Sequence, residues 1–197
     1  MSNWLFGCTI GEMEESLFLQ PAKALEAVSL SEGMHVADLG AGSGFFTRAA
    51  ARAVGPTGVV WAVDMLPDLL TRVKNLSLAE GLTNVEIVRG DVELPKGSHL
   101  PEATFDIVIV SNLLFALEQR LAAAHEVARI LRPGGRAVII DWRDSFGGLG
   151  PHPDHVLTIG TARDLFERAT LEFVQDIPAG EYHWGFVVRK KVRSTAQ

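Results

Sequence analysis

Short apolar runs alternate along this chain with segments in which apolar residues recur at helical spacing. The runs are rich in Val, Ile and Leu and stop at glycine or polar residues, which is typical of buried strands. They cover residues 34–40, 58–64, 84–91, 105–111 and 136–142. Strands that alternate with helices form a parallel sheet with helices on both faces, so the pattern predicts an α/β fold.

The helical segments lie between these runs. One helix is expected directly after Gly44, and a second near Pro67, a residue preorganised for a first helical turn. A long helix is expected from Leu114 to Leu131, ended by the Arg-Pro-Gly-Gly sequence at 132–135. Right-handed crossovers between parallel strands then predict a doubly wound, Rossmann-like sheet.

The pattern changes after the fifth run. Residues 143–155 are rich in Gly and Pro, and we expect a loop long enough to form a pocket wall. Residues 171–177 and 184–190 then read as two strands of a terminal antiparallel hairpin.

The chain therefore divides into three predicted parts. Residues 1–33 form a short helical lead-in with Pro21 at a helix start, residues 34–192 a single domain, and residues 193–197 a tail. The length of 197 residues and the hydrophobic content of 47% fit one globular domain with a sizeable core.

Charge and cysteine content narrow the function classes. A net charge of -6 gives no electrostatic footprint for nucleic acid, so we expect no nucleic-acid partner. Cys8 is the single cysteine, which excludes an intrachain disulfide and a multi-cysteine metal site and favours a reducing, cytoplasmic location. No apolar run reaches the roughly 18 residues of a membrane span, and the first residues lack the pattern of a signal peptide.

The glycine-rich segment 36–49, VADLGAGSGFFTRA, carries the first chemical signal. A strand that turns at once into a helix needs backbone free of Cβ restrictions, which Gly40, Gly42 and Gly44 supply. The following helix presents unpaired N–H groups and a positive dipole end to a ligand. Since dinucleotide-binding folds use G-x-G-x-x-G, the spacing here is a variant of that motif, and a tight turn without ligand is the structural alternative.

Polar residues at the ends of the next strands add to this signal. Asp64 follows the second strand, where it suits both hydroxyls of a ribose or a helix N-cap. Asp91, after the third strand, suits the exocyclic amine of an adenine, with Val92 against the ring. The alternative is that Asp91 is a solvated acidic residue of the loop. Ser111 and Asn112 follow the fourth strand and face the same cleft or cap a helix.

Four segments together resemble the motifs of class I S-adenosylmethionine-dependent methyltransferases. VADLGAGSGFF is similar to their glycine-rich first motif, VVWAVDM to the ribose-binding segment, IVRGDV to the adenine-binding segment and LRPGGRAVIIDW to the fifth strand. The resemblance covers residues 34–191 and is strongest to the small type 11 and quinone-biosynthesis-like methyltransferases. It implies a seven-stranded sheet of order 3-2-1-4-5-7-6 whose last strand is antiparallel.

The resemblance also implies a cofactor, S-adenosyl-L-methionine, with S-adenosyl-L-homocysteine as product. The three glycines would let the backbone approach the methionine and ribose parts, Asp38 would hold the amino group, Asp64 the ribose hydroxyls, and Met65 would pack on the adenine. Asp91 and Val92 would read the adenine edge. The full set implied for the cofactor is Asp38, Gly40, Ala41, Gly42, Gly44, Asp64, Met65, Asp91, Val92 and Ser111.

The acceptor side is expected at the same strand ends. Asp141 ends the fifth strand, the following loop brings His155, and the hairpin turn brings His183, so these three are the candidate catalytic residues. His152 and His155 could also be simple loop residues or, with two nearby acids, metal ligands, and no metal site is predicted. The aromatic residues Phe46, Phe115, Trp142, Phe146 and Trp184 suit a small apolar acceptor, or are core residues.

The predicted function is methyl transfer to a small-molecule acceptor by in-line displacement, by an enzyme that could be a homodimer. One alternative is a non-catalytic module that senses S-adenosylmethionine. Another is a nicotinamide-dependent oxidoreductase, which the glycine spacing opposes. A Tyr-x-x-x-Lys catalytic pair is also excluded, because the single tyrosine, Tyr182, is followed four residues later by Phe186.

Overall fold

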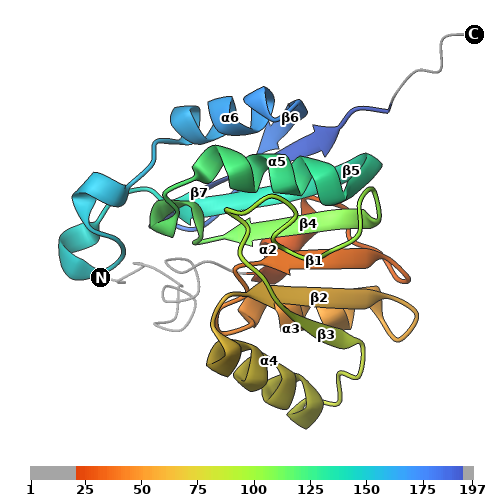
Figure 1. The fold of residues 1–197 in the computed structure, drawn as a ribbon. Coiled ribbons are helices and arrows are strands. Elements are labelled where there is room, and N and C mark those ends of the chain that lie inside the picture. Colours follow the sequence, from red (N-terminus) through yellow and green to blue (C-terminus); the bar gives the residue numbers. More distant parts are fainter. Residues whose placement is uncertain (1–20, 193–197) are drawn as a thin grey trace, which may run out of the picture.

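A computed structural model describes residues 21–192 of the chain, and in this range seven strands form one sheet of order β3-β2-β1-β4-β5-β7-β6 (Figure 1). Five strands are parallel neighbours, and β7 runs antiparallel between β5 and β6. The predicted α/β fold, strand order and antiparallel last strand are therefore confirmed. The strands are β1 (His35–Leu39), β2 (Val59–Asp64), β3 (Val85–Arg89), β4 (Phe105–Ser111), β5 (Leu131–Trp142), β6 (Leu171–Asp176) and β7 (His183–Lys190).

Helices cover both faces of the sheet (Figure 1). Those on one face are α2 (Pro21–Glu26), α3 (Phe45–Val54) and α4 (Pro67–Ala79); those on the other are α5 (Arg120–Ile130) and α6 (Ile159–Arg168). Three short 3₁₀ turns, η1 (Leu114–Ala116), η2 (Phe146–Gly148) and η3 (Pro153–His155), follow the carboxyl ends of β4 and β5. The lead-in helix from Pro21 is present, whereas residues 1–20, including Cys8, and 193–197 lie outside the described residues.

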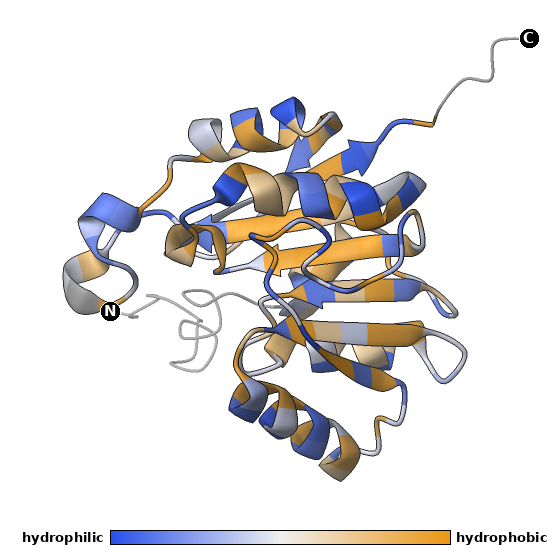
Figure 2. Ribbon diagram, in the orientation of Figure 1, coloured by the Kyte–Doolittle hydropathy of each residue, from blue (hydrophilic) through white to orange (hydrophobic). Residues whose placement is uncertain are grey.

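Two hydrophobic cores sandwich the sheet because successive strand residues point to opposite faces. In β5, Ala137 and Ile139 pack on the α5 and α6 side, whereas Val138 and Ile140 pack on the α2, α3 and α4 side. Figure 2 shows the same arrangement as strands β4 and β5 that are mostly hydrophobic and helices that carry both colours. This alternation decides which residues at the strand ends can share a site.

The connection from β4 to β5 differs from the prediction of one long helix from Leu114 to Leu131. Residues 114–116 form only the 3₁₀ turn η1, Leu117 is extended, and α5 begins at Arg120. The chain breaks here because the buried Asp141 carboxylate accepts the N–H groups at the start of η1, which fixes this turn to β5. The predicted helix end at 132–135 is also wrong, since β5 already begins at Leu131 and pairs with Phe105 across a bulge.

No helix within residues 21–192 has both the length and the apolar character needed to cross a bilayer.

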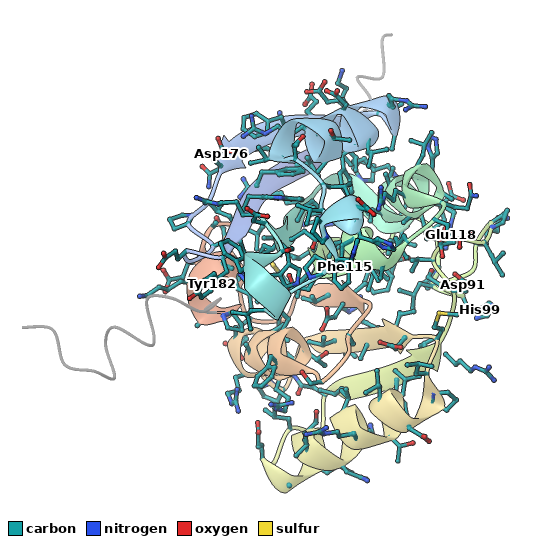
Figure 3. All side chains as sticks on the ribbon, turned by 90° about the vertical axis from the view of Figure 1, so that its left-hand side faces the viewer. Asp91, His99, Phe115, Glu118, Asp176 and Tyr182 are labelled. Atoms are coloured by element: carbon teal, nitrogen blue, oxygen red, sulfur yellow. The ribbon has the colours of Figure 1, made fainter. Side chains whose placement is uncertain are left out.

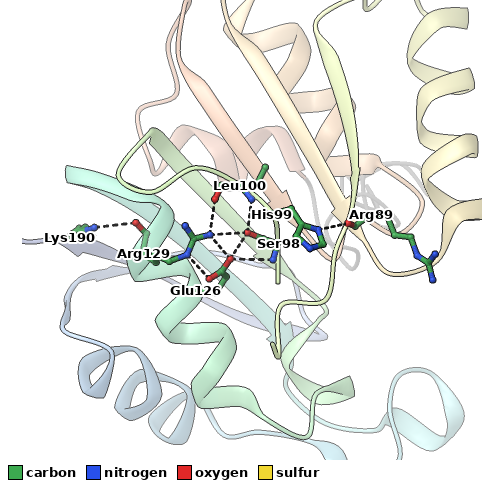
Figure 4. Close-up of polar contacts among 7 residues, drawn as sticks. All are labelled: Arg89, Ser98, His99, Leu100, Glu126, Arg129 and Lys190. Carbon is green, nitrogen blue, oxygen red and sulfur yellow. Dashed lines mark hydrogen bonds and ion pairs between the residues drawn. The ribbon is translucent and has the colours of Figure 1, made fainter. Parts of the chain in front are cut away.

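A buried ion pair fixes the loop after β3 to helix α5 (Figure 4). Glu126 accepts hydrogen bonds from the Ser98 backbone and hydroxyl and from the Arg129 guanidinium, whose Nη2 lies 2.7 Å from Oε1. Arg129 also donates to the Leu100 carbonyl oxygen at 2.8 Å. Burial raises the pKa of Glu126, but the hydrogen bonds from Arg129 and Ser98 outweigh it and hold the pKa below its usual value. The pair therefore anchors residues 98–100 to helix α5.

Replacing Glu126 with alanine leaves the Arg129 guanidinium, whose side chain is only 17% exposed, without its carboxylate partner. We expect the free energy of unfolding to fall by about 3–5 kcal/mol, the usual cost of an uncompensated buried charge. Urea denaturation followed by tryptophan fluorescence measures this. The matched control is Glu118→Ala at an exposed loop position, with an expected change within about 0.5 kcal/mol. Equal stabilities of the two variants would show that the pair does not anchor the loop.

Candidate functional site

The glycine-rich turn between β1 and α3 has the backbone that its sequence predicts. Gly40, Gly42 and Gly44 have φ values of 71, 52 and 74°, all in the left-handed region that favours glycine. The N–H groups of Gly40 and Ala41 both donate to the Val63 carbonyl oxygen, at 2.8 and 3.0 Å, so the turn is fastened to the end of β2.

Two of these glycines are also sites of close approach. A Cβ on Gly40 would lie 2.7 Å from a methyl group of Leu113, and a Cβ on Gly44 would lie 2.9 Å from a methyl group of Val73. Gly42 has more room, with its nearest neighbour at 3.8 Å. Leu113 and Val73 thus pack closely against Gly40 and Gly44, whereas Gly42 between them has no close neighbour.

Asp38 lies beneath this turn with an exposed fraction of 2%. Its carboxylate accepts a hydrogen bond from the Thr47 hydroxyl at 2.5 Å, and the Thr47 backbone N–H also donates to it. Burial raises the pKa of Asp38 to about 6 against these hydrogen bonds, and the nearby Asp64 carboxylate adds to the rise. A carboxylate held at the N-terminus of α3 in this way is suited to a cationic ligand group.

A cavity of about 550 Å³ opens beside the turn and Asp38. The cavity extends past the ends of β4 and β5 to the start of β7. The glycine turn and the end of β5 therefore border the same space. Five of the ten residues expected to contact the cofactor line it, namely Asp38, Gly40, Ala41, Gly42 and Ser111. The other lining residues are Pro21, Ser43, Phe45, Phe46, Asn112, Trp142 and His183.

Asp64 stands beside the turn rather than in the cavity wall. One of its carboxylate oxygens accepts the Gly42 N–H and the other accepts the Leu66 N–H, each at 3.0 Å. Asp64, which the sequence predicts to bind the ribose hydroxyls, therefore also shapes the glycine turn. Met65, next in the chain, is 57% exposed, and its side chain is free to cover a ligand at this edge.

Asp91 and Val92 begin the tight loop after β3. Asp91 accepts the Glu93 N–H at 2.9 Å, and Val92 is buried in the core under α5. Figure 3 looks onto the edge where the strands end, with Asp91 and His99 at the right, Phe115 near the middle and Tyr182 at the left. Asp91 thus lies at the edge where the strands end, and neither Asp91 nor Val92 lines the cavity.

Asp141 points away from the cavity, to the α5 face. It is 1% exposed and accepts the N–H groups of Trp142 at 2.8 Å and Phe115 at 3.2 Å. Burial raises the pKa of Asp141 to about 6, against these backbone hydrogen bonds. Its geometry is that of a residue that positions η1, since the strand alternation brings Trp142, and not Asp141, to the cavity.

His155 is also separate from the cavity. It is exposed on η3, where its ring lies 6.3 Å from that of His152. The guanidinium of Arg120, at the start of α5, reaches the His155 carbonyl oxygen at 3.5 Å. Among residues 21–192 no three His, Cys, Asp or Glu side chains come close enough to hold a metal ion.

His183 differs from the other two candidate catalytic residues because it lines the cavity and is only 3% exposed. Its ring packs on Trp142 with centroids 4.4 Å apart. Burial, with a smaller contribution from the Arg143 cation, lowers the pKa of the His183 ring to about 4. The imidazole is therefore neutral near pH 7, and both of its ring nitrogens are buried without a hydrogen-bond partner in the described residues.

The aromatic residues predicted for the acceptor side also divide between the cavity wall and the core. Phe46 and Trp142 line the cavity, whereas Trp184 is buried on the α5 and α6 side and donates to the Leu157 carbonyl oxygen at 2.9 Å. Thr47 and Phe45 were not expected at the site. A threonine in the first turn of the predicted helix could have drawn attention to Thr47. No local sequence signal marks Phe45, which is exposed.

Gly44→Ala tests the close approach at the glycine turn, and Gly81→Ala is its matched control. Both residues have φ of +74°, but nothing lies within 4 Å of a Cβ on Gly81. Backbone strain alone should cost about 1–2 kcal/mol at either position. We expect Gly44→Ala to cost at least about 1 kcal/mol more, because of overpacking against Val73. Equal losses in chemical denaturation would contradict the close packing of the turn.

Asp38→Asn tests the cost of the buried carboxylate. Its folded pKa of about 6 exceeds its ordinary value of 3.8, so its contribution to stability is greatest below pH 4 and is lost as pH rises through 6. At pH 7 we expect the variant to be more stable than the parent by about 1–3 kcal/mol. The difference should shrink towards pH 4 in denaturation curves. A variant that is less stable at pH 7 would show that the carboxylate supports the fold.

Comparison with known proteins agrees with this geometry. The methyltransferase domain family matches residues 30–176. The ubiquinone/menaquinone biosynthesis C-methyltransferase UbiE of Burkholderia vietnamiensis is 31% identical over 121 residues, which are 61% of this chain and 48% of that protein. The arsenite methyltransferase of Halobacterium salinarum is 34% identical over 130 residues, 65% of this chain and 31% of that protein. The chain thus spans about half or less of the length of these relatives.

The crystal structure of a SAM-dependent methyltransferase from Aquifex aeolicus has the same fold, with a TM-score of 0.78 and 27% identity. The match covers 87% of this chain and 90% of that one. The family match spans most of the chain and includes the glycine turn, the buried Asp38 and the ends of β4 and β5 at the cavity. On this evidence the chain belongs to the methyltransferase domain family, among the class I S-adenosylmethionine-dependent methyltransferases.

Proposed function

We propose that the chain transfers the methyl group of S-adenosylmethionine to a small-molecule acceptor by in-line displacement. The observation that carries this proposal is the cavity of about 550 Å³, which reaches from the glycine turn and Asp38 to Trp142 and His183. Its volume lies within the roughly 300–1,000 Å³ of small-molecule sites. One space can thus bring a cofactor at β1 and an acceptor at β5 and β7 into contact.

The strand order gives the cofactor its direction. Asp91, Asp64 and the Asp38 turn follow β3, β2 and β1, which are consecutive neighbours in the sheet. An extended ligand across these ends would have its adenine near Asp91 and Val92, its ribose near Asp64 and Met65, and its methionine part at the glycine turn. Its sulfonium would then lie towards Ser111 and β4.

The residues at the turn fit the methionine part. The buried Asp38 carboxylate, with Thr47 as its hydrogen-bonding partner, is suited to the α-ammonium group, and this cation would offset the cost of its burial. The open position at Gly42 lets the ligand reach the backbone. Gly40, Ala41 and Gly44 act through the shape of the turn.

The chemistry needs little from the protein beyond placement. When bound, S-adenosylmethionine would supply an electrophilic methyl group for transfer to a lone pair of the acceptor, with the carbon–sulfur electron pair left on sulfur. Trp142 and Phe46 give this space aromatic walls, and we assign the neutral His183 ring beside Trp142 to the side that positions the acceptor. Asp141 acts by positioning η1, and the exposed His155 belongs to the outer loop.

The relatives support a small acceptor. One acts in ubiquinone and menaquinone biosynthesis and one on arsenite, both of which involve small molecules. The single cysteine of this chain, Cys8, cannot supply a multi-cysteine arsenite site, which favours an organic acceptor.

Calorimetry with purified protein tests the cofactor assignment. We expect S-adenosylmethionine and S-adenosylhomocysteine to bind, NAD and NADP not to bind, and Asp38→Asn to weaken S-adenosylmethionine binding at least about tenfold through loss of a charged hydrogen bond. The control is Asp144→Asn, an exposed residue outside the cavity wall. Binding of NAD in place of the methionine compounds would overturn the proposal.

Methyl transfer is then measured with S-adenosylmethionine labelled in its methyl group and a metabolite extract, with the product identified by mass spectrometry. A labelled small molecule is the expected result. Binding of the cofactor without transfer to any component would instead favour a sensor.

A further inference from the structure

Arg48, near the start of α3, contacts three consecutive residues at the end of the glycine turn. Its Nη1 atom donates to the Ser43 carbonyl oxygen at 2.9 Å and would lie 3.3 Å from a Cβ on Gly44. Its Cζ atom lies over the ring of Phe45, 5.3 Å from the ring centre, within the range of a cation–π contact. A single side chain thus joins residues 43–45 to the body of α3.

Glu80, at the C-terminal end of α4, holds the Arg48 guanidinium in place. The Arg48 Nε atom lies 3.0 Å from Glu80 Oε1, and the two form an ion pair rather than an aligned hydrogen bond. The Arg48 side chain is only 12% exposed, so solvent screens this pair less than it screens a surface pair. Glu80 also pairs with Arg52, whose side chain is 56% exposed. A chain of contacts therefore runs from α4 through Arg48 to the glycine turn.

The turn needs an anchor at this point because glycine backbone is intrinsically free. Gly42 and Gly44 flank Ser43 with φ of 52 and 74°, and glycine adopts positive and negative φ about equally readily. The first half of the turn is fastened to the Val63 carbonyl oxygen by backbone hydrogen bonds. The carbonyl group of Ser43 is instead fastened by the Arg48 side chain.

The anchored residues form part of the cavity wall. Of the described residues, Ser43 and Phe45 line the cavity and Arg48 does not. Phe45 is 65% exposed, so few protein contacts besides the guanidinium restrain its ring. Any influence of Arg48 on a ligand in the cavity therefore acts through residues 43–45.

We propose that Arg48 is a positioning residue for the cofactor, and that it keeps residues 43–45 in the shape that receives the methionine part of S-adenosylmethionine. A segment that is already ordered loses less conformational entropy when the ligand binds, which strengthens binding. This inference rests on the proposed function, because that function places the methionine part at the glycine turn.

Arg48→Met removes the guanidinium and keeps an unbranched side chain between α3 and α4. Glu80 retains Arg52 as its partner, so the substitution leaves no unpaired carboxylate. We expect S-adenosylhomocysteine to bind at least about fivefold more weakly, because residues 43–45 must then become ordered on binding. Isothermal titration calorimetry measures this affinity.

The matched control is Arg52→Met, which makes the same change of charge one helical turn away. Arg52 also pairs with Glu80 but donates no hydrogen bond to residues 43–45. Its exposed ion pair contributes little, so S-adenosylhomocysteine affinity should stay within about twofold of the parent value. Equal losses in the two methionine variants would indicate an effect of charge alone and would overturn the proposal.

NMR relaxation of the backbone N–H groups separates positioning from a general loss of stability. In ligand-free Arg48→Met, the order parameters of residues 43–45 should fall from about 0.85 to below about 0.6. Those of Gly40 and Ala41, which are bonded to Val63, should not change. Residues 43–45 that stay rigid in this variant would show that Arg48 does not order the turn, whether or not the cofactor binds there. A parent protein that binds no S-adenosylhomocysteine would instead count against the proposed function.

Glu80→Gln tests the same chain of contacts from α4 and remains informative if Arg48→Met does not fold. We expect it to weaken S-adenosylhomocysteine binding at least about twofold in the parent and no further in Arg48→Met, since residues that act as a unit are not additive. An unchanged affinity in Glu80→Gln, or in Arg48→Met, would contradict the assignment of Arg48.

Discussion

The burial of one carboxylate organises this end of the molecule. Asp38 ends β1 beneath the glycine turn, is 2% exposed, and has its pKa raised to about 6 by that burial. The Thr47 hydroxyl and the N-terminus of α3 stabilise the charge only in part. A buried carboxylate at a cavity wall is stabilised most by a bound cation. The energetic cost of burying Asp38 therefore supports the proposal that a cationic group of the cofactor binds there.

The alternation of side chains along the strands distributes the other residues of the site. At the ends of β5 and β7, Trp142 and His183 point to the α3 side and border the cavity, whereas Asp141 and Trp184 point to the α5 side. A shift of one residue in either strand would exchange the two sets. The acceptor side of the cavity thus depends on strand register as much as on the residue types present.

The sequence was sufficient for the strands and the turn, because both depend on local signals, whereas the strand order was implied by the family resemblance. Apolar runs gave the strands, and the glycines at 40, 42 and 44 are needed for left-handed φ and close approach. It was insufficient for the acceptor side. The direction of Asp141 follows from register, the early break before α5 follows from the contact of Asp141 with η1, and the unpaired ring nitrogens of His183 follow from packing between distant segments.

The most direct test is an NMR titration of the Asp38 carboxyl group, labelled with ¹³C, with and without S-adenosylhomocysteine. If the ligand ammonium binds at Asp38, the pKa should fall from about 6 by at least about one unit on binding, and affinity should drop as pH falls through 6. A pKa that stays at its free value or rises in the complex would contradict the assignment of this carboxylate to the cofactor.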